Sequence, residues 1–316
     1  VSFDPKNNNI FFKAHGYTKG IDPYYEHLYR VNINGSNLKI LNSGNFNTNT
    51  YFGDKNYFVS NFSRVNTTPK SELLDANGNL VLKLETADLS ALFESGYKFP
   101  EPFKAKANDG ITDIYGVMYK PFDFDERKKY PLIEYVYPGP QTEAVDKSFS
   151  ADYRWTRKDM LAQIGFIVVT LGNRGGHPDR SKWYHNYGYG NLRDYGLADK
   201  KYVAEQLAAR HDYIDINKVG IFGHSGGGFM STAAILVYPD FFKVAVSSAG
   251  NHDNAIYNSW WSESHHGIEK ELDKDGNIEY KYEIDNNQEL AKNLKGHLLL
   301  VTGDMDNNVH PAATMR

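Results

Sequence analysis

The sequence predicts an α/β domain with a mostly parallel, doubly wound sheet, preceded by a separate segment of antiparallel β-structure. Three observations predict this order. Residues 1–95 are rich in Asn, Tyr, Phe and turn residues and hold no helical period for more than a few residues. Several strands after residue 130 are almost continuously apolar, as strands of a sheet covered on both faces must be. One of them ends in Gly-x-Ser-x-Gly at residues 223–227 and continues into an apolar segment with helical character.

Short strands separated by turn signals make up the first segment. Asn34-Gly35 and Asn77-Gly78 are typical of tight hairpin turns. The expected strands are residues 9–14, 27–32, 38–41, 57–62, 71–75 and 80–84. Groups of four strands at a spacing of roughly 40 residues favour the C-terminal blades of a β-propeller. Because one or two blades cannot close a propeller, we expect the chain to be a piece of a longer protein.

A Pro-containing stretch at residues 98–102 marks the expected domain boundary. The sequence thus predicts the truncated propeller at residues 1–96 and the α/β domain at residues 97–316. An antiparallel hairpin opens the second domain, and apolar strands follow it, with a helix predicted before the serine strand. The expected elements are a hairpin of residues 103–107 and 115–119, strands 132–137, 166–171, 219–222, 244–248 and 298–302, and a helix over 197–209.

Ser225 is the candidate nucleophile. A strand followed by a sharp turn and a helix leaves the serine hydroxyl exposed at the strand end, and Gly223 and Gly227 suit a turn in which a Cβ would collide. The same turn directs the backbone N–H of Gly226 toward an oxyanion forming at the serine. This combination is typical of the α/β-hydrolase fold.

The acid and the base of a catalytic triad should follow the serine in the order Ser, Asp, His. Asp306 is the preferred acid, with Asp304 as the alternative, because both follow the last apolar strand. His310 lies too close behind Asp306 to belong to a separate loop, and all the other histidines precede the acid. We therefore expect the general base to lie beyond Arg316, so that the chain by itself is inactive.

Tyr137 stands at the end of a predicted strand, directly before a Pro-Gly-Pro turn. A phenol at that position can donate a second hydrogen bond to the oxyanion, as a partner of the Gly226 amide.

Four motifs together resemble the prolyl oligopeptidase family, and within it the dipeptidyl peptidase IV branch. The motifs are residues 135–140 (Tyr-Val-Tyr-Pro-Gly-Pro), 171–176 (Leu-Gly-Asn-Arg-Gly-Gly), 223–228 (Gly-His-Ser-Gly-Gly-Gly) and 303–310 (Gly-Asp-Met-Asp-Asn-Asn-Val-His). The resemblance covers nearly the whole chain and implies a β-propeller followed by an α/β-hydrolase domain.

The resemblance implies roles for individual residues. It assigns Ser225 as nucleophile, Asp306 as acid, and Tyr137 with the Gly226 amide as oxyanion hole. Asn308 falls where the branch binds a substrate carbonyl, and Tyr257 with Trp261 matches the aromatic wall of the proline pocket. Asn251 and Asn254 stand where the branch has apolar pocket residues, so they are candidate substrate-binding residues that leave a strict proline preference open.

The predicted function is a serine peptidase that removes dipeptides from peptide N-termini, after proline or a small residue. An oligopeptidase or acylaminoacyl-peptidase of the same family is an alternative, because it would keep the triad and differ in how the propeller controls the access of substrates. A non-catalytic propeller binding module is the alternative from another class. The resemblance favours a periplasmic or secreted protein, and a homodimer stays open.

The composition limits the classes of partner and cofactor that we expect for this protein. The 316 residues carry a formal net charge of −4 and no cysteine. This charge offers no basic surface for nucleic acid, and the lack of cysteine excludes disulfides and thiolate metal ligands. No apolar run approaches the ~20 residues that span a bilayer. Residues 273–277 predict an exposed hairpin turn rather than a calcium loop. Residues 263–266 could bind a metal but lack a third ligand at the proper spacing. Arg174 is expected to brace the loops of the active site. We expect peptide substrates and no cofactor.

Overall fold

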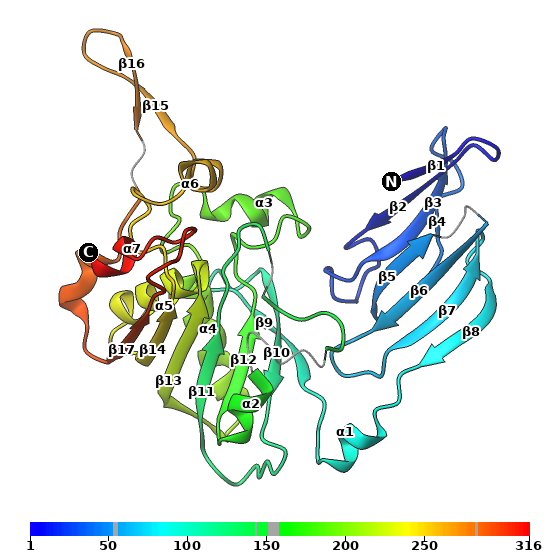
Figure 1. Ribbon diagram of the computed structural model, residues 1–316, viewed down its shortest axis with the longest axis horizontal. Coiled ribbons are helices and arrows are strands. Elements are labelled where there is room, and N and C mark those ends of the chain that lie inside the picture. Colours follow the sequence, from blue (N-terminus) through cyan, green and yellow to red (C-terminus); the bar gives the residue numbers. More distant parts are fainter. Residues whose placement is uncertain (53–55, 143, 151–157, 282–283) are drawn as a thin grey trace. The chain divides into compact units, whose positions relative to one another are not determined.

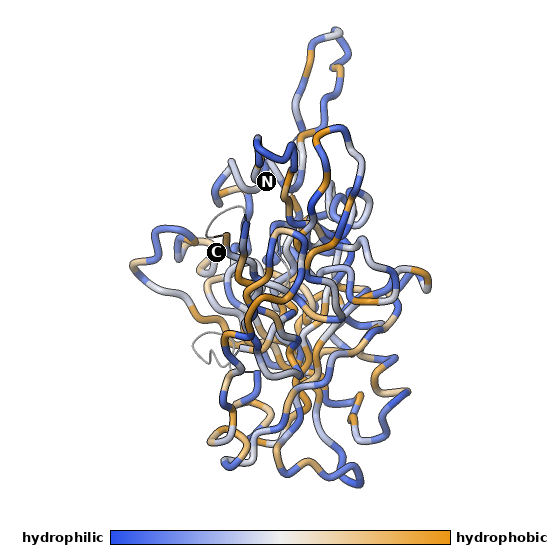
Figure 2. Tube along the Cα trace, turned by 90° about the vertical axis from the view of Figure 1, so that its right-hand side faces the viewer, coloured by the Kyte–Doolittle hydropathy of each residue, from blue (hydrophilic) through white to orange (hydrophobic). Residues whose placement is uncertain are grey.

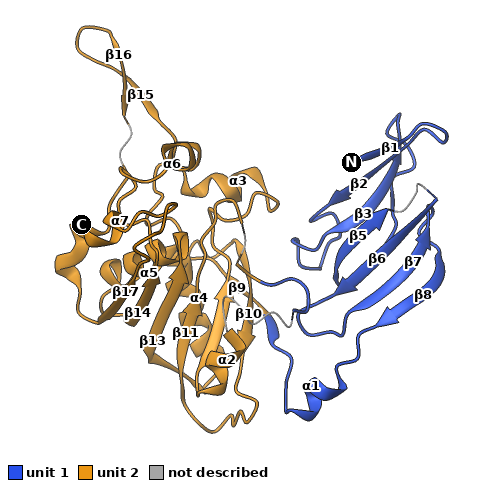
Figure 3. Cartoon of the chain, in the orientation of Figure 1, with its two compact units in different colours: residues 1–102, 146–153 blue, residues 103–145, 154–316 orange. Residues whose placement is uncertain are grey.

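The computed structural model describes residues 1–52, 56–142, 144–150, 158–281 and 284–316. The chain forms two compact units, shown in Figure 3. Unit 1 comprises Val1–Pro102 and Asp146–Tyr153, and unit 2 comprises Phe103–Val145 and Arg154–Arg316. The sequence predicts a single division between residues 96 and 97. In the structure the first division falls after Pro102, and a second segment, Asp146–Tyr153, also belongs to unit 1.

Unit 1 contains two four-stranded antiparallel sheets (Figure 1), each with its strands side by side in chain order. The first sheet is formed by β1 (Ser2–Asp4), β2 (Asn9–Ala14), β3 (His27–Asn32) and β4 (Lys39–Ile40). The second is formed by β5 (Asn47–Phe52), β6 (Tyr57–Ser63), β7 (Lys70–Asp75) and β8 (Leu80–Thr86), and α1 (Ser90–Glu94) follows it. These meanders are blade-like, which confirms the predicted architecture of this segment.

Strand β5 was not predicted from the sequence, because most of its residues are polar. Its inward side chains Thr48 and Thr50 are buried, and hydrogen bonds satisfy them. The amide of Asn42 donates to the hydroxyl oxygens of Thr50 at 3.2 Å and Ser60 at 3.1 Å. A buried amide thus replaces apolar packing beside β5, so hydrophobic alternation is missing from its sequence.

Residues 146–150 complete unit 1 through polar and aromatic contacts. Lys147 Nζ lies 2.8 Å from Asp22 Oδ2 and 4.4 Å from the ring centroid of Tyr24. The backbone N–H of Phe149 donates to Ser63 Oγ at 3.0 Å. These side chains come from a segment that follows the first strands of unit 2.

Unit 2 is built on a seven-stranded sheet with the strand order β17-β14-β13-β11-β12-β10-β9. The strands are β9 (Glu101–Lys106), β10 (Asp113–Tyr119), β11 (Tyr130–Tyr135), β12 (Ile167–Leu171), β13 (Ile214–His224), β14 (Phe242–Ser248) and β17 (His297–Val301). Neighbouring strands from β17 to β12 are parallel, and β10 pairs antiparallel with β12. This is the mixed, mostly parallel sheet that the apolar strands predict.

Helices cover both faces of this sheet. Successive residues of a strand point to opposite faces, and Glu134 and Tyr135 are neighbours on β11. Glu134 interacts with Lys200 of α4 (Leu197–Arg210), whereas the ring of Tyr135 lies 5.5 Å from Nζ of Lys158 on α2 (Lys158–Gln163). Helices α4 and α2 therefore lie on opposite faces of β11, as the doubly wound prediction requires.

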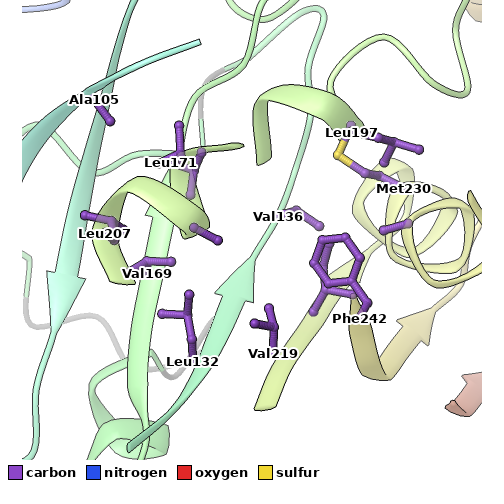
Figure 4. Packing of buried hydrophobic residues seen from close by; sticks show 14 of the residues in the cluster. Ala105, Leu132, Val136, Val169, Leu171, Leu197, Leu207, Val219, Met230 and Phe242 are labelled. Carbon is purple, nitrogen blue, oxygen red and sulfur yellow. The ribbon is translucent and has the colours of Figure 1, made fainter. Parts of the chain in front are cut away.

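One hydrophobic cluster joins the sheet to α4 and to α5 (Gly226–Val237), as Figure 4 shows. Leu132, Val169 and Val219 are contributed by neighbouring strands, while Leu207 and Met230 are contributed by the helices. In Figure 2 many of the outer turns of the chain are hydrophilic, while hydrophobic residues are frequent in the segments between them. Burial of each large aliphatic side chain stabilises the fold by about 1.5–3 kcal/mol, which fixes α5 against β13 and β14.

The remaining elements of unit 2 are short. They are α3 (Lys182–His185), η1 (Asn186–Gly188), α6 (Ser259–His266), β15 (Glu269–Leu272), β16 (Ile278–Lys281), η2 (Gln288–Asn293) and α7 (Ala312–Met315). Strands β15 and β16 form an exposed hairpin whose turn is closed by Asp273, since its Oδ1 accepts the N–H groups of Asp275 and Asn277. No helix in the described residues is long and apolar enough to traverse a bilayer.

Candidate active site

The candidate site lies at the carboxyl edge of the parallel strands. Strand β13 leads into Ser225, while β14 and β17 end beside it in parallel register. Two backbone hydrogen bonds continue past the strand ends, from Ser225 N–H to Ser248 O at 2.8 Å and from Ala249 N–H to Val301 O at 2.7 Å. This edge is where open α/β sheets bind ligands, because loops after several strands converge there.

Ser225 has a strained backbone. Its φ of 56° and ψ of −122° place an L-residue in the left-handed half of conformational space, which costs about 1–3 kcal/mol. The conformation persists because the neighbours hold it: Ser248 accepts its N–H, and the Ser225 carbonyl accepts the N–H of Phe229 at 3.0 Å. The residue is half-buried, at the start of α5.

The flanking glycines are sterically required. A Cβ added at Gly223 would lie 2.4 Å from the carbonyl oxygen of Val136, and one added at Gly227 would lie 2.1 Å from the same atom. Both distances are far shorter than any real contact. The turn therefore packs directly on the backbone that leads from β11 to Tyr137, as the sequence argument anticipates.

Tyr137 lies beside the start of α5. A Cβ built on Gly226 would lie 3.9 Å from Cζ of the Tyr137 ring, the carbon that carries the hydroxyl group. The structure thus brings the phenol close to the Gly226 backbone, whose N–H is the other predicted oxyanion donor. Gln141, which the sequence analysis did not single out, donates from Nε2 to the Tyr137 hydroxyl at 3.2 Å. Its only signal in the sequence is its position just after the Pro-Gly-Pro turn.

Asp306 lies in the loop after β17 and is held by backbone groups. Its Oδ1 accepts the N–H groups of Val309 and Asn308, each at 2.9 Å. These hydrogen bonds, that of Val309 first, lower the pKa of the Asp306 carboxyl, and His224 lowers it further. The carboxylate is thereby kept ionised. Asp304, the alternative acid, is exposed.

Two histidines near the site already have hydrogen-bond partners. Nδ1 of His224 lies 3.1 Å from Ser248 Oγ, on the strand next to the serine. Nδ1 of His310 accepts the N–H of Ala312 at 3.1 Å, at the beginning of α7. A general base that lies beyond Arg316 stays a prediction.

The structure brings Tyr257 together with residues from two other loops. The Asn308 side chain lies beside the Tyr257 phenol, and Tyr137 and Asp306 are close enough to act on its charge. Burial raises the pKa of Tyr257, Tyr137 adds to the rise, and Asn308 opposes it. The ring centroids of Tyr257 and Trp261 lie 5.7 Å apart in an edge-to-face arrangement. The two rings thus form one aromatic surface next to the predicted oxyanion donor.

Asn251 and Asn254 are placed differently from the aromatic pair. Both side chains are buried, with exposed fractions of 2% and 1%. Nδ2 of Asn251 donates to Oδ1 of Asn254 at 2.7 Å, while Nδ2 of Asn254 has no hydrogen-bond partner among the described residues. The two amides bond to each other instead of presenting a polar surface, so direct contact with substrate stays a prediction for them.

Arg174 braces the loop after β12. Its guanidinium donates to Asp199 Oδ1 at 2.8 Å and to Asp109 Oδ2 at 3.2 Å, and its Cζ lies 4.2 Å from the ring centroid of Tyr187. Asp199 is fully buried on α4, so Arg174 supplies the charge that its carboxylate needs. No cluster of three or more metal-ligating side chains occurs within the described part of the chain.

The chain is similar to known peptidases. Residues 151–316 match the model of the prolyl oligopeptidase family. Human dipeptidyl peptidase 8 is 32% identical over 218 residues, which cover 69% of this chain and 24% of that protein. A protein of Ajellomyces dermatitidis assigned as a dipeptidyl-aminopeptidase B is 27% identical over 97% of this chain and 33% of its own length. The chain thus spans a quarter to a third of the length of these curated relatives.

Solved structures agree with the fold. A crystal structure from Bacteroides ovatus, of a protein assigned as a dipeptidyl aminopeptidase IV, superposes with a TM-score of 0.81 at 28% identity, covering 99% of this chain and 43% of its own. Dipeptidyl peptidase 4 of Porphyromonas gingivalis superposes with a TM-score of 0.79 at 23% identity, over 99% and 42% of the two chains. The predicted fold, propeller blades followed by an α/β hydrolase, is confirmed. With the family match across more than half of its residues, the chain belongs to the prolyl oligopeptidase family.

Proposed function

We propose that the full-length protein is a serine dipeptidyl aminopeptidase that cleaves after proline or a small residue. The observation that carries the proposal is the strained backbone of Ser225, at the turn between β13 and α5. Such strain is expected where a nucleophile must be exposed and oriented. The names of the similar proteins support a peptidase that releases dipeptides.

In the proposed reaction, Ser225 Oγ attacks the scissile carbonyl carbon while a histidine outside these 316 residues takes its proton. Asp306 orients that histidine and stabilises its charged form. The Tyr137 hydroxyl and the Gly226 N–H donate to the oxyanion, an arrangement supported by their proximity at the start of α5. The histidine then returns the proton to the leaving amine, and water hydrolyses the acyl-enzyme.

Tyr257, Trp261 and Asn308 are the proposed substrate-binding residues. The edge-to-face pair of rings offers an apolar wall suited to a proline ring. The Asn308 amide can donate to a substrate carbonyl, and it lies beside the Tyr257 phenol. Asn251 and Asn254 are further candidate substrate-binding residues in the proposal, and because they are polar the proposed specificity is not restricted to proline.

The test uses the full-length protein, a dipeptide-proline chromogenic substrate and a fluorophosphonate label. The wild-type protein should release the chromophore and incorporate the label at Ser225, and Ser225→Ala should lose both. Asp306→Asn should lower kcat by about 10⁴-fold, because the histidine would lose its orienting carboxylate.

Asp304→Asn is the matched control, since Asp304 is an exposed acid in the same loop. It should retain wild-type kcat. A loss of activity in Asp304→Asn instead of Asp306→Asn would reverse the assignment of the acid. Cleavage of N-terminally blocked peptides alone would point to an oligopeptidase, and an unlabelled, inactive wild-type protein would point to a binding module.

A further inference from the structure

Helix α5 begins with an unfavourable sequence, the three glycines at positions 226–228. Each glycine costs about 1 kcal/mol relative to alanine in a helix. Sterics nevertheless require two of them, because a Cβ added at Gly227 would lie 2.1 Å from the Val136 carbonyl oxygen and one added at Gly228 would lie 2.6 Å from the Ser248 carbonyl oxygen. The first turn of α5, which carries the Gly226 N–H and follows the strained serine, therefore needs support from outside the helix.

A buried hydrogen-bond network supplies this support. Ser247 Oγ donates to the carbonyl oxygen of Gly228 at 2.8 Å, and Asn287 Nδ2 donates to the carbonyl oxygen of Phe229 at 3.0 Å. His252 connects the two, with Nε2 at 3.3 Å from Ser247 Oγ and Nδ1 at 3.0 Å from Asn287 Nδ2. The Asn287 backbone N–H also donates to the His252 carbonyl at 3.1 Å.

The partners determine the tautomer of His252. Asn287 presents its amide NH₂ to Nδ1, so Nδ1 must accept and carries no proton. Nε2 then carries the proton and donates to Ser247 Oγ, whose own hydrogen is directed at Gly228. A second proton on the ring would point Nδ1–H at the Asn287 NH₂ group. If the Asn287 amide were turned over, its oxygen would face Nδ1–H, but the carbonyl oxygen of Phe229 would lose its donor. Only the neutral ring therefore allows all of these hydrogen bonds.

The side chains of the network lie deep in unit 2. His252 is 5% exposed, Asn287 2% and Ser247 1%. Gly250 makes room for the imidazole, because a Cβ there would lie 2.5 Å from His252 Cε1. Burial lowers the pKa of His252 to about 4, which keeps the ring neutral at ordinary pH. The side-chain atoms that meet the helix are therefore paired and no charge has to be desolvated, while Oδ1 of Asn287 has no hydrogen-bond partner among the described residues.

We infer that His252 is a positioning residue for Ser225. As a neutral imidazole it couples Ser247 and Asn287 to the first turn of α5, and so fixes the Gly226 N–H relative to the serine. The inference rests on the proposed peptidase activity and adds a residue that contacts neither substrate nor the reacting atoms. Its loss should affect the chemical step rather than substrate binding, because the oxyanion donor matters most in the transition state.

The experiment measures kcat and KM of the full-length protein on the dipeptide-proline substrate, with the active fraction counted by fluorophosphonate titration. His252→Ala should lower kcat by about 100-fold, the effect of a misplacement of about 1 Å, while KM changes less than about 3-fold. His252→Gln should recover most of the lost kcat, because its amide offers one acceptor and one donor in the same directions.

Ser247→Ala is a milder variant for the case in which His252→Ala does not fold, and it should lower kcat by about 10-fold. Thr170→Val is the matched control, since Thr170 is also fully buried on a strand and its hydroxyl donates to a backbone carbonyl, that of Ala144 at 3.2 Å. It should leave kcat unchanged.

The outcomes separate the inference from the proposed function. Wild-type activity in Ser225→Ala would overturn the proposed function itself. Activity that depends on Ser225, combined with wild-type kcat per active site in His252→Ala and Ser247→Ala, would overturn the positioning role, even if both variants melt at a lower temperature. A fall in kcat that His252→Gln does not recover would overturn the assigned tautomer.

Discussion

The side chain of Asn308 lies beside the phenol of Tyr257, which brings the loop after β17 together with the segment before α6. The two residues belong to different predicted roles, carbonyl recognition and the aromatic wall. Their contact means that the two parts of the proposed substrate site are not independent.

A double-mutant cycle should detect this coupling. Tyr257→Phe and Asn308→Ala should each destabilise the folded protein by about 1 kcal/mol, and the double variant by little more than either, because both remove the same polar interaction. Urea unfolding followed by tryptophan fluorescence measures the free energies. Tyr280→Phe, on the exposed hairpin strand β16 with 70% of its surface accessible, is the control and should have no effect. Additive losses would mean that the contact contributes nothing to stability.

Glycine 227 should tolerate no side chain. Gly227→Ala places a methyl group 2.1 Å from the carbonyl oxygen of Val136, so the turn must move and the protein should lose at least about 3 kcal/mol of stability. Fluorophosphonate labelling of Ser225 should disappear as well. Gly220→Ala on β13, the strand that leads into the turn, is the control, because its new Cβ would meet no atom closer than 3.5 Å. Equal behaviour of the two variants would argue against the packing described for the turn.

The buried Glu134 should make stability depend on alkaline pH. Burial raises the pKa of Glu134 from 4.5 to about 8, with Lys200 opposing the rise, and neither carboxyl oxygen has a hydrogen-bond partner in the described structure. A raised pKa means that the folded state binds the proton more tightly than the unfolded state. The resulting stability is complete below pH 4.5 and is lost as pH rises toward 8.

Glu134→Gln removes this titration, so its free energy of unfolding should fall less than that of the wild type between pH 5 and about 8.5. The measurement is urea unfolding at a series of pH values. Glu279→Gln, an exposed substitution on β16, should keep the wild-type profile. A wild-type profile in Glu134→Gln would show that the carboxyl stays ionised beside Lys200.

The buried His252 should make the stability fall as pH is lowered, whereas the buried Glu134 makes it fall as pH is raised. Its pKa is lowered from 6.5 to about 4, so the unfolded state binds the proton more tightly. The contribution is complete above pH 6.5 and is lost as pH falls toward 4, about 3 kcal/mol in all. His252→Gln should flatten this acid limb in thermal unfolding, while His297→Gln at an exposed position should leave it unchanged.

The nucleophile turn could be predicted from the sequence because its determinants are local. Gly223, Ser225 and Gly227 lie within five consecutive residues, and a Cβ at Gly223 would already lie 2.6 Å from the carbonyl carbon of Gly227 inside the same turn. The packing of both glycines on the Val136 carbonyl comes from a distant part of the sequence. The parallel strands were predictable for a similar reason, since burial on both faces leaves a continuous apolar run in each of them.

The rest depends on residues that are distant in sequence. Glu134 and Lys200 lie on different elements, and each alone suggests an exposed position, because only the packing of α4 on β11 buries them together. No local motif marks His252, because its role depends on Asn287 and on two carbonyl groups of α5 that are distant in sequence. Strand β5 lacks hydrophobic alternation because a buried asparagine takes the place of apolar contacts.

The return of residues 146–150 to unit 1 has a consequence for how the protein is made. Asp22 pairs with Lys147, which lies 125 residues further along the chain. At about 5–20 residues per second, a ribosome needs roughly 6–25 s to make that stretch. Strands β9, β10 and β11 of unit 2 are synthesised in the interval. The unit that emerges first is thus completed only after the second has begun to form, and a nascent chain exposes the carboxylate of Asp22 until its lysine arrives.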